Sequence, residues 1–276
     1  MIVLFCLPIV QINQFNQRYS MDAYSSLDSI KQSLGITPPD SRERSPISVV
    51  WDSVFQRVAQ AGGWELKTGS AYFEKPAIMG TEWELYKRST QVVVEVYSTE
   101  SLDESVDFMV YLASQTTMME IPFRQSDTPV GDYTLMPRTG PMDKLYWTYG
   151  NICFVFTLND GNADLTSLAS MVQKVIKQTD TMETFLSPIQ IADRDSMKKS
   201  IVVEETLKIT LEKMEGEEHF MIDAFSLRGN MRVLSTGIDG IVVKGIKKGN
   251  DTIAIVKGDP VTLRSVQAHC EITVTD

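Results

Sequence analysis

The stretch VVKGIKKGNDTIAIV, residues 242–256, shows most directly what kind of fold the chain contains. Two glycines four residues apart, Gly245 and Gly249, enclose a lysine pair, and an alternating apolar run follows. A glycine permits the positive φ that a tight hairpin turn needs, and alternation places Ile253 and Ile255 on one face of a strand. The stretch therefore predicts a β-hairpin with one buried face, and it predicts no catalytic role.

This hairpin belongs to a series of short predicted strands that fills residues 201–276. Turn signals rich in Gly, Asn, Asp and Pro separate the strands, and no helical period occurs among them. About seven strands within about 80 residues are typical of an antiparallel β-sandwich. The predicted strands are residues 201–203, 207–211, 219–224, 231–234, 241–245, 252–256 and 268–274.

The same region resembles the C-terminal half of a bacterial Ig-like domain of the group 2 type. In that family one strand, a tight turn with two glycines and the next strand follow a fixed spacing, and EITV at residues 271–274 matches the usual closing strand. The chain departs from the family at Asp251, where a small residue is usual. The resemblance implies an extracellular or periplasmic setting, a role as spacer or adhesive module, and no catalytic residues. The matching positions are Val243, Lys244, Gly245, Ile246, Gly249 and Ile253.

Residues 46–180 mix helical and strand periods, which predicts an α+β domain: an antiparallel sheet with helices on one face. Ser101 and Glu104 have the spacing of a capping box, which marks the start of a helix. Two hairpins, at residues 85–97 and 145–157, each precede an amphipathic helix and have the pattern of an internal repeat. Helices are predicted near residues 47–61, 101–115 and 164–177, and strands at 64–66, 71–73, 82–86, 91–97, 133–136, 144–149 and 152–158.

The other segments are predicted to connect or lead. Residues 1–45 are expected to be a leader or tether with a short helix near residues 26–34, and residues 181–200 a linker. The apolar run at residues 2–10 has the length of a signal-peptide core but lacks the basic residues that usually precede one. Three readings stay open: a signal-like leader, sequence upstream of a start at Met21, or an apolar strand that docks on the body.

Composition excludes several classes of function. The 36 acidic and 26 basic residues give a net charge of −10, which disfavours nucleic-acid binding. No window approaches the roughly 18 consecutive apolar residues of a transmembrane helix. No CxxC spacing occurs, and the only histidines, His219 and His269, stand at the starts of tail strands. We therefore predict no metal site and no cofactor.

Two groups of side chains are candidates for function. The aromatic residues Trp83, Tyr86, Trp147 and Tyr149 lie in the paired hairpins, where they either pack in the core or form an aromatic surface for a glycan or protein partner. Glu82 and Glu84 share one face of a strand, and such a pair serves as acid and base only if both groups are buried and face each other. No residue is predicted to be catalytic.

From these observations we expect a non-enzymatic binding or interaction protein, secreted or in the cell envelope, with an Ig-like spacer or adhesive module. A protein or a glycan is the expected partner, and the oligomeric state is not predicted. Two other readings are compatible with the sequence. One is a cytosolic interaction or immunity-type protein that starts near Met21, and the other is an enzyme that depends on carboxylates of the α+β domain.

Overall fold

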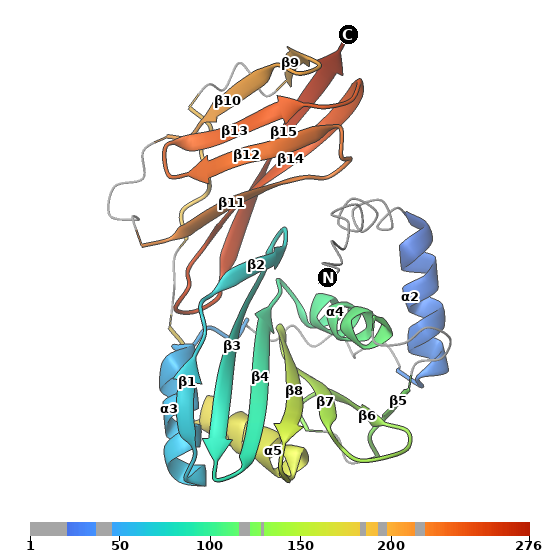
Figure 1. Ribbon diagram of the computed structural model, residues 1–276, viewed down its shortest axis with the longest axis vertical. Helices are drawn as coiled ribbons and strands as arrows, with labels where there is room; N and C mark the ends of the chain where they lie inside the picture. Colours follow the sequence, from blue (N-terminus) through green and yellow to red (C-terminus); the bar gives the residue numbers. More distant parts are fainter. Residues whose placement is uncertain are drawn as a thin grey trace, which may run out of the picture.

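Figure 1 shows the computed structural model of the chain. The chain is mostly β, with several antiparallel sheets and a smaller number of helices. A large sheet with helices lies in the lower half of Figure 1, and two smaller sheets formed by the tail lie in the upper half. The predicted leader at residues 1–20 falls outside the described residues. Those are residues 21–36, 46–115, 122–127, 130–182, 186–192, 198–212 and 219–276.

The large sheet has eight strands in the order β1-β3-β4-β8-β7-β6-β5, with β2 beside β3, and every pairing is antiparallel. The two predicted hairpins are β3–β4 and β7–β8, and β4 lies directly beside β8. The prediction that both hairpins share one sheet is therefore confirmed. The strands are β1 Glu65–Thr68, β2 Tyr72–Lys75, β3 Ile78–Lys87, β4 Thr90–Ser98, β5 Phe123–Gln125, β6 Tyr133–Pro137, β7 Lys144–Tyr149 and β8 Ile152–Asp160.

Helices cover both faces of this sheet, so the prediction of helices on one face is wrong (Figure 1). Two helices, α3 and α5, share a core with Val94 and Phe154, and the other two, α2 and α4, share a core with Tyr97 and Val155. The physical reason is visible in ICFVF at residues 152–156, which is apolar at every position and leaves both faces of β8 in need of cover. The helices are α2 Met21–Ser33, α3 Trp51–Gly62, α4 Leu102–Ser114 and α5 Leu165–Lys177.

Part of the predicted tether is packed against the body. Helix α2 was expected as a short helix near residues 26–34, and the buried side chains of Leu27, Leu34 and Ile36 join the core beneath α4. Lys31 forms a salt bridge with Asp107 of α4. Residues 21–36 therefore extend the α+β part rather than link to it.

The helix-capping prediction holds with one change. The Glu104 backbone N–H donates to the Ser101 hydroxyl at 3.2 Å, as a capping box requires. The Glu104 carboxylate accepts from the backbone N–H of Glu100 at 2.9 Å, one residue before the expected partner. These two bonds fix the chain at the entry to α4, beside the site described below.

All seven predicted tail strands are present, in two sheets of order β10-β13-β12 and β11-β14-β15-β9 that enclose one apolar core. One pairing departs from the antiparallel prediction, because β9 runs parallel to β15. The strands are β9 Lys198–Val202, β10 Thr206–Thr210, β11 Met221–Ser226, β12 Met231–Gly237, β13 Gly240–Gly245, β14 Gly249–Gly258 and β15 Ser265–Thr275.

The stretch with which the sequence analysis began forms β13 and β14, but the predicted hairpin is wrong, because the two strands lie in different sheets: β13 pairs with β10 and β12, and β14 pairs with β11 and β15. The turn between them carries the chain from one sheet of the sandwich to the other. Gly249 has φ 143°, a conformation that favours glycine, and Ile253 and Ile255 are both buried in the sandwich core. Asp251 is also buried, and its carboxylate accepts hydrogen bonds from the Ser226 hydroxyl at 2.7 Å and from the backbone N–H of Asn230 at 2.8 Å. This carboxylate therefore holds the turn between β11 and β12, which explains an acidic residue at that position.

Candidate functional site

The loop between β14 and β15 fastens the tail to the α+β part. The backbone N–H of Trp51 donates to the Val261 carbonyl at 3.3 Å, and the indole nitrogen of Trp51 donates to the Thr262 carbonyl at 3.2 Å. The side chain of Leu263 is buried in the core between the large sheet and helices α3 and α5. Within the loop, the Asp259 carboxylate accepts from the Thr262 hydroxyl at 2.6 Å. The tail is thus held by packing as well as by hydrogen bonds.

A second contact lies at the end of β14. A Cβ added to Gly258 would meet the sulfur of Met79 at 2.0 Å, so only glycine permits this approach of β14 to β3. Nearby, the Ser265 hydroxyl donates to the Ala77 carbonyl at 3.1 Å, from the first residue of β15 to the turn between β2 and β3. These two contacts fix the position of β14 and β15 relative to the large sheet.

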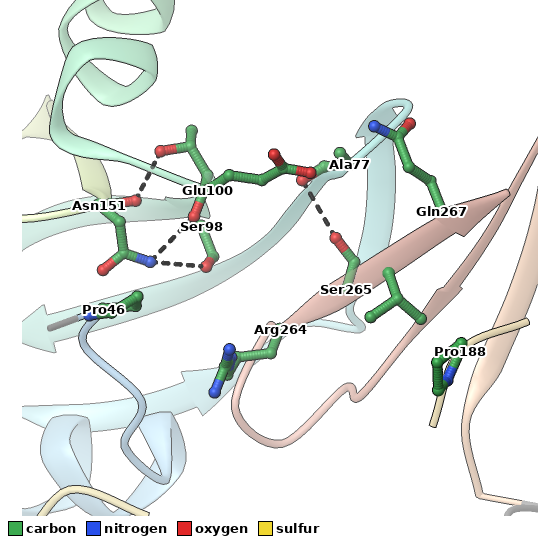
Figure 2. Close-up of a pocket in the computed structure, with 11 residues that line it drawn as sticks. Pro46, Ala77, Ser98, Glu100, Asn151, Pro188, Arg264, Ser265 and Gln267 are labelled. Atoms are coloured by element: carbon green, nitrogen blue, oxygen red, sulfur yellow. Dashed lines mark hydrogen bonds between the residues drawn. The ribbon is translucent and has the colours of Figure 1, made fainter. Parts of the chain in front are cut away.

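Between these contacts lies a cavity of about 370 Å³, which we call the junction cleft (Figure 2). On the side of the α+β part, the cleft is lined by residues at the end of β4 and just before β8. On the side of the tail, it is lined by residues at the start of β15. Its polar or charged lining comes from both parts of the chain. The residues that line it include Ala77, Ser98, Glu100, Asn151, Arg264 and Gln267.

A hydrogen-bonded layer forms one wall of the junction cleft. The buried side chain of Asn151 accepts from the Ile47 backbone N–H at 2.7 Å and donates to the Thr99 carbonyl at 3.0 Å and the Ser98 hydroxyl at 3.5 Å (Figure 2). The Thr99 hydroxyl in turn donates to the Asn151 carbonyl at 2.9 Å. Because this network joins three segments distant in sequence, the wall is preformed.

The charged side chains of the junction cleft stand at its rim. Glu100 and Gln267 are exposed and Arg264 is half-buried. In Figure 2 the Glu100 side chain points in the direction of Ala77, whereas the Arg264 guanidinium points in the direction of Pro46. No histidine or cysteine is among the described residues that line the cleft. The arrangement offers charges of both signs and hydrogen-bonding groups, which suits binding rather than nucleophilic catalysis.

Ala77 has φ 64°, in the left-handed region that residues with a side chain rarely adopt. It lines both the junction cleft and a second cavity of about 280 Å³. Such backbone conformations cost about 1–3 kcal/mol and are concentrated at functional sites. The strained turn therefore marks this edge of the molecule as a candidate site independently of the cavities.

The second cavity is more apolar and contains one amine. The Lys75 ammonium lies 3.3 Å from the centroid of the Tyr111 ring, and burial lowers the pKa of Lys75 to about 8. Burial also raises the pKa of the Glu104 carboxyl, which lines the same cavity. Since both cavities adjoin Ala77 and Gln267, they flank the same turn.

The two tryptophans of the predicted aromatic surface lie in the core, which corrects that prediction. Trp83 is stacked on Phe55 at 4.3 Å between ring centroids, and its indole nitrogen donates to Asp52 at 3.0 Å. Trp147 is stacked on Phe154 at 4.0 Å. Both side chains are buried because the α3 and α5 face of the large sheet is covered. Core packing is the role that the structure gives them.

The two tyrosines of that prediction are only half-buried and have other contacts. The Tyr86 hydroxyl hydrogen-bonds to the Glu84 carboxylate, on the face opposite to Trp83. The Lys177 ammonium lies 5.7 Å from the centroid of the Tyr149 ring. The four predicted residues therefore do not make one exposed surface.

The predicted carboxylate pair does not form a buried, facing arrangement. Glu82 is exposed, and Glu84 is hydrogen-bonded to Lys67, Tyr86 and Gln91. The hydrogen bond from the Lys67 ammonium is the main reason why the pKa of the Glu84 carboxyl lies below its usual range. Glu84 is thus held ionised within a network of side chains.

Across the described ranges there is no cluster of three or more His, Cys, Asp or Glu side chains able to hold a metal ion. None of the helices described is both long and apolar enough to cross a membrane. Cys153 and Cys270 are free and buried, and burial raises the pKa of the Cys153 thiol. This thiol is therefore a core group of low reactivity.

Sequence reasoning missed the junction cleft. Its residues come from six segments that no spacing connects, and the one local signal was GDPVTL at residues 258–263. That turn contains Leu263, an apolar residue outside every predicted strand. An apolar residue in such a turn indicates that the loop packs against another part of the chain. Compared with protein-family models and with curated proteins, the chain finds no match. The function is therefore inferred from the geometry of the junction cleft.

Proposed function

We propose that this chain is a non-enzymatic binding protein, secreted or in the cell envelope, and that the junction cleft is its binding site. The proposal is carried by one observation: both parts of the chain line the cleft. The hydrogen bond from Trp51 to Thr262 holds these two parts together. Small-molecule and peptide sites typically have volumes of roughly 300–1,000 Å³ and occur where domains meet. A cavity of about 370 Å³ lies within that range.

We further propose that the tail is an Ig-like sandwich that docks the α+β part rather than acting as a free spacer. The support is the positive φ of Gly249 at the start of β14, the burial of Ile253 and Ile255 in the core between the two tail sheets, and the burial of Leu263 in the neighbouring core. A tail fixed in this way presents its loop as part of the binding site. The partner is a protein or a glycan that inserts a polar group into the cleft.

Site-specific photo-crosslinking tests the binding site. A photoreactive amino acid at Gln267, at the rim of the junction cleft, should capture a partner in cell extract or culture fluid, and excess unlabelled protein should compete it away. The matched control places the same group at Lys208, an exposed residue of β10 in the tail. Equal capture at both positions, or none at either, contradicts the proposal.

The cellular location needs a separate measurement. We expect the protein recovered from fractionated cells that express the natural reading frame to lie outside the cytoplasm, and its intact mass to show removal of an N-terminal segment. Unprocessed protein in the cytosol would favour the reading of a cytosolic interaction protein and would remove the adhesive role. It would leave the binding site to be judged by crosslinking alone.

A further inference from the structure

The second cavity, of about 280 Å³, contains an amine that the proposed function does not use. We propose that this cavity is a covalent binding site for small apolar aldehydes, which the Lys75 amine holds as an imine. The cavity adjoins the junction cleft at the turn of Ala77 but has a lining of a different kind. The inference therefore goes beyond the binding function proposed above and is tested separately from it.

The Lys75 amine lies beside two aromatic rings. Lys75 is the last residue of β2, and it is the one lysine among the described residues that line the cavity. Its nitrogen lies 3.3 Å from the centroid of the Tyr111 ring and 5.4 Å from that of the Phe108 ring. Both rings belong to α4 and line the same cavity. A carbonyl group that enters the cavity therefore meets the amine against the surface of this helix.

The lining suits a ligand with an apolar body. Leu27 of α2, together with Pro76 and Ile78 at the turn between β2 and β3, adds apolar surface to that of the two rings. Removing apolar surface from water is favourable in proportion to its area. A dry apolar cavity of roughly 150 Å³ is enough to hold benzene. A cavity of about 280 Å³ therefore has room for an aromatic ring that carries a carbonyl group.

The surroundings of Lys75 also favour its reactive form, the neutral amine. Burial lowers the pKa of Lys75 to about 8, against the opposing charge of the neighbouring Glu74. Two carboxyl groups of α4 line the same cavity: Asp107 forms a salt bridge with Lys31, and burial raises the pKa of Glu104. At pH 7 about one Lys75 side chain in ten is therefore neutral, against about one in 2,500 for an ordinary lysine.

The reaction needs no reagent other than the aldehyde. The lone pair of the neutral amine attacks the carbonyl carbon, both amine protons pass to the carbonyl oxygen, and this oxygen leaves as water when the C=N bond forms. Nothing is oxidised or reduced. Lysines react with carbonyl groups in this way when an apolar pocket desolvates the amine. Because apolar surroundings also exclude the water that hydrolyses an imine, the cavity should retain the product.

Reductive trapping of the unaltered protein tests the inference. Sodium cyanoborohydride at pH 7 converts each imine formed with benzaldehyde into a stable benzylamine, and mass spectrometry of peptides identifies the modified lysines. We expect Lys75 to react about a hundredfold faster than Lys208, an exposed lysine of β10, because more of its amine is neutral and the cavity holds the ring. With formaldehyde, which has no apolar body, the preference should fall to about tenfold.

Two matched variants assign the reaction. Lys75→Arg keeps a cation at this position, but a guanidinium does not form the imine, so the fast modification should disappear while that of Lys208 is unchanged. Lys208→Arg should keep the fast modification at Lys75. In urea, where the cavity is lost, the two lysines should react equally.

The outcomes that overturn the inference are distinct from those that overturn the junction cleft. Equal rates at Lys75 and Lys208 in the folded protein overturn the site, and so does a preference that persists in urea. The same preference with benzaldehyde and formaldehyde would show a reactive amine without a cavity that holds the ligand, which overturns the ligand class. None of these results depends on whether a photoreactive group at Gln267 captures a partner.

Discussion

The indole nitrogen of Trp51, the first residue of α3, donates a hydrogen bond of 3.2 Å to the carbonyl of Thr262 in the loop between β14 and β15. The two residues are 211 positions apart in sequence. Since Trp51 itself is buried in the core between the large sheet and helices α3 and α5, the bond joins the tail to a core residue of the α+β part. The shape of the junction cleft therefore depends on this contact.

The first prediction concerns the residue that anchors the loop. Leu263→Ala should reduce the free energy of unfolding by about 2–5 kcal/mol, because it leaves a cavity in a core shared by both parts of the chain. Urea unfolding measures the loss. Val261→Ala in the same loop is the control, because this side chain is 46% exposed and its truncation should cost at most about 0.5 kcal/mol. Similar losses for both variants would mean that the loop does not dock as described.

The second prediction concerns the turn between β11 and β12. In Asp251→Asn, an NH2 group replaces one carboxylate oxygen. Oδ1 accepts from the backbone N–H of Arg228 and Oδ2 from that of Met231, so whichever oxygen is replaced, a backbone N–H loses its acceptor. We expect a loss of about 1–3 kcal/mol in the free energy of unfolding. Glu271→Gln, an exposed change of the same chemical kind on β15, should be neutral. A neutral Asp251→Asn would show that the carboxylate does not organise the turn.

How far the sequence predicts this fold depends on the range of the interaction. The strands of the tail and the cap of α4 follow from local pattern, because alternation at Ile253 and Ile255 and the spacing of Ser101 and Glu104 act within a few residues. The prediction of helices on one face was wrong, because the repeat pattern of residues 85–97 and 145–157 carries no information about which side of the sheet α4 takes. Only ICFVF at residues 152–156 of β8, which is apolar at every position and buried on both faces, signals cover on each side.

The candidate site was less predictable than the fold. Aromatic residues in strands suit a core or a surface equally well in sequence, and the burial of Trp83 and Trp147 is decided by helices that lie elsewhere in the chain. The cleft depends on the packing of Leu263 against the α+β part, and the sequence around Leu263 does not indicate which residues it contacts. Ala77, whose positive φ marks the site, is an ordinary residue in the sequence.

The third prediction is a pH dependence. The Tyr72 hydroxyl donates to that of Tyr97 at 3.1 Å, which donates to the Glu95 carboxylate at 2.8 Å. Burial raises the pKa of Tyr72 to about 12, and burial, reinforced by the Glu95 charge, raises the pKa of Tyr97 further. The pKa values of these two phenols are higher in the folded protein than in the unfolded chain. The stability that their protonated forms contribute is therefore complete below about pH 10 and is lost as the pH rises through 12.

Tyr97→Phe should therefore lose less stability than the unaltered protein between pH 10 and pH 12. The titration of a single phenol changes the free energy of unfolding by at most about 1.4 kcal/mol per pH unit. The difference in the free energy of unfolding between the two proteins should therefore change with pH at a rate that approaches but does not exceed this value. Urea unfolding at a series of pH values measures it. At pH 7 the phenols at this site are protonated in both proteins, so the comparison there gives the cost of the lost hydroxyl alone. Parallel curves above pH 10 would contradict the raised pKa.

The last prediction separates strain from function at the turn beside the cleft. Ala77 and Arg88 both have a positive φ, 64° and 57°, and both lie in turns that join neighbouring strands of the large sheet. Glycine relieves a left-handed cost of about 1–2 kcal/mol, and its greater freedom in the unfolded chain offsets about 0.4–1 kcal/mol of that gain. Ala77→Gly and Arg88→Gly should therefore each stabilise the protein by about 0.5 kcal/mol, seen as a small rise in Tm. Only Ala77→Gly should reduce the capture of a partner by a photoreactive amino acid at Gln267, because Ala77 lines the junction cleft and a freer turn no longer holds its shape. Equal binding by both variants would assign the strain at Ala77 to the fold alone.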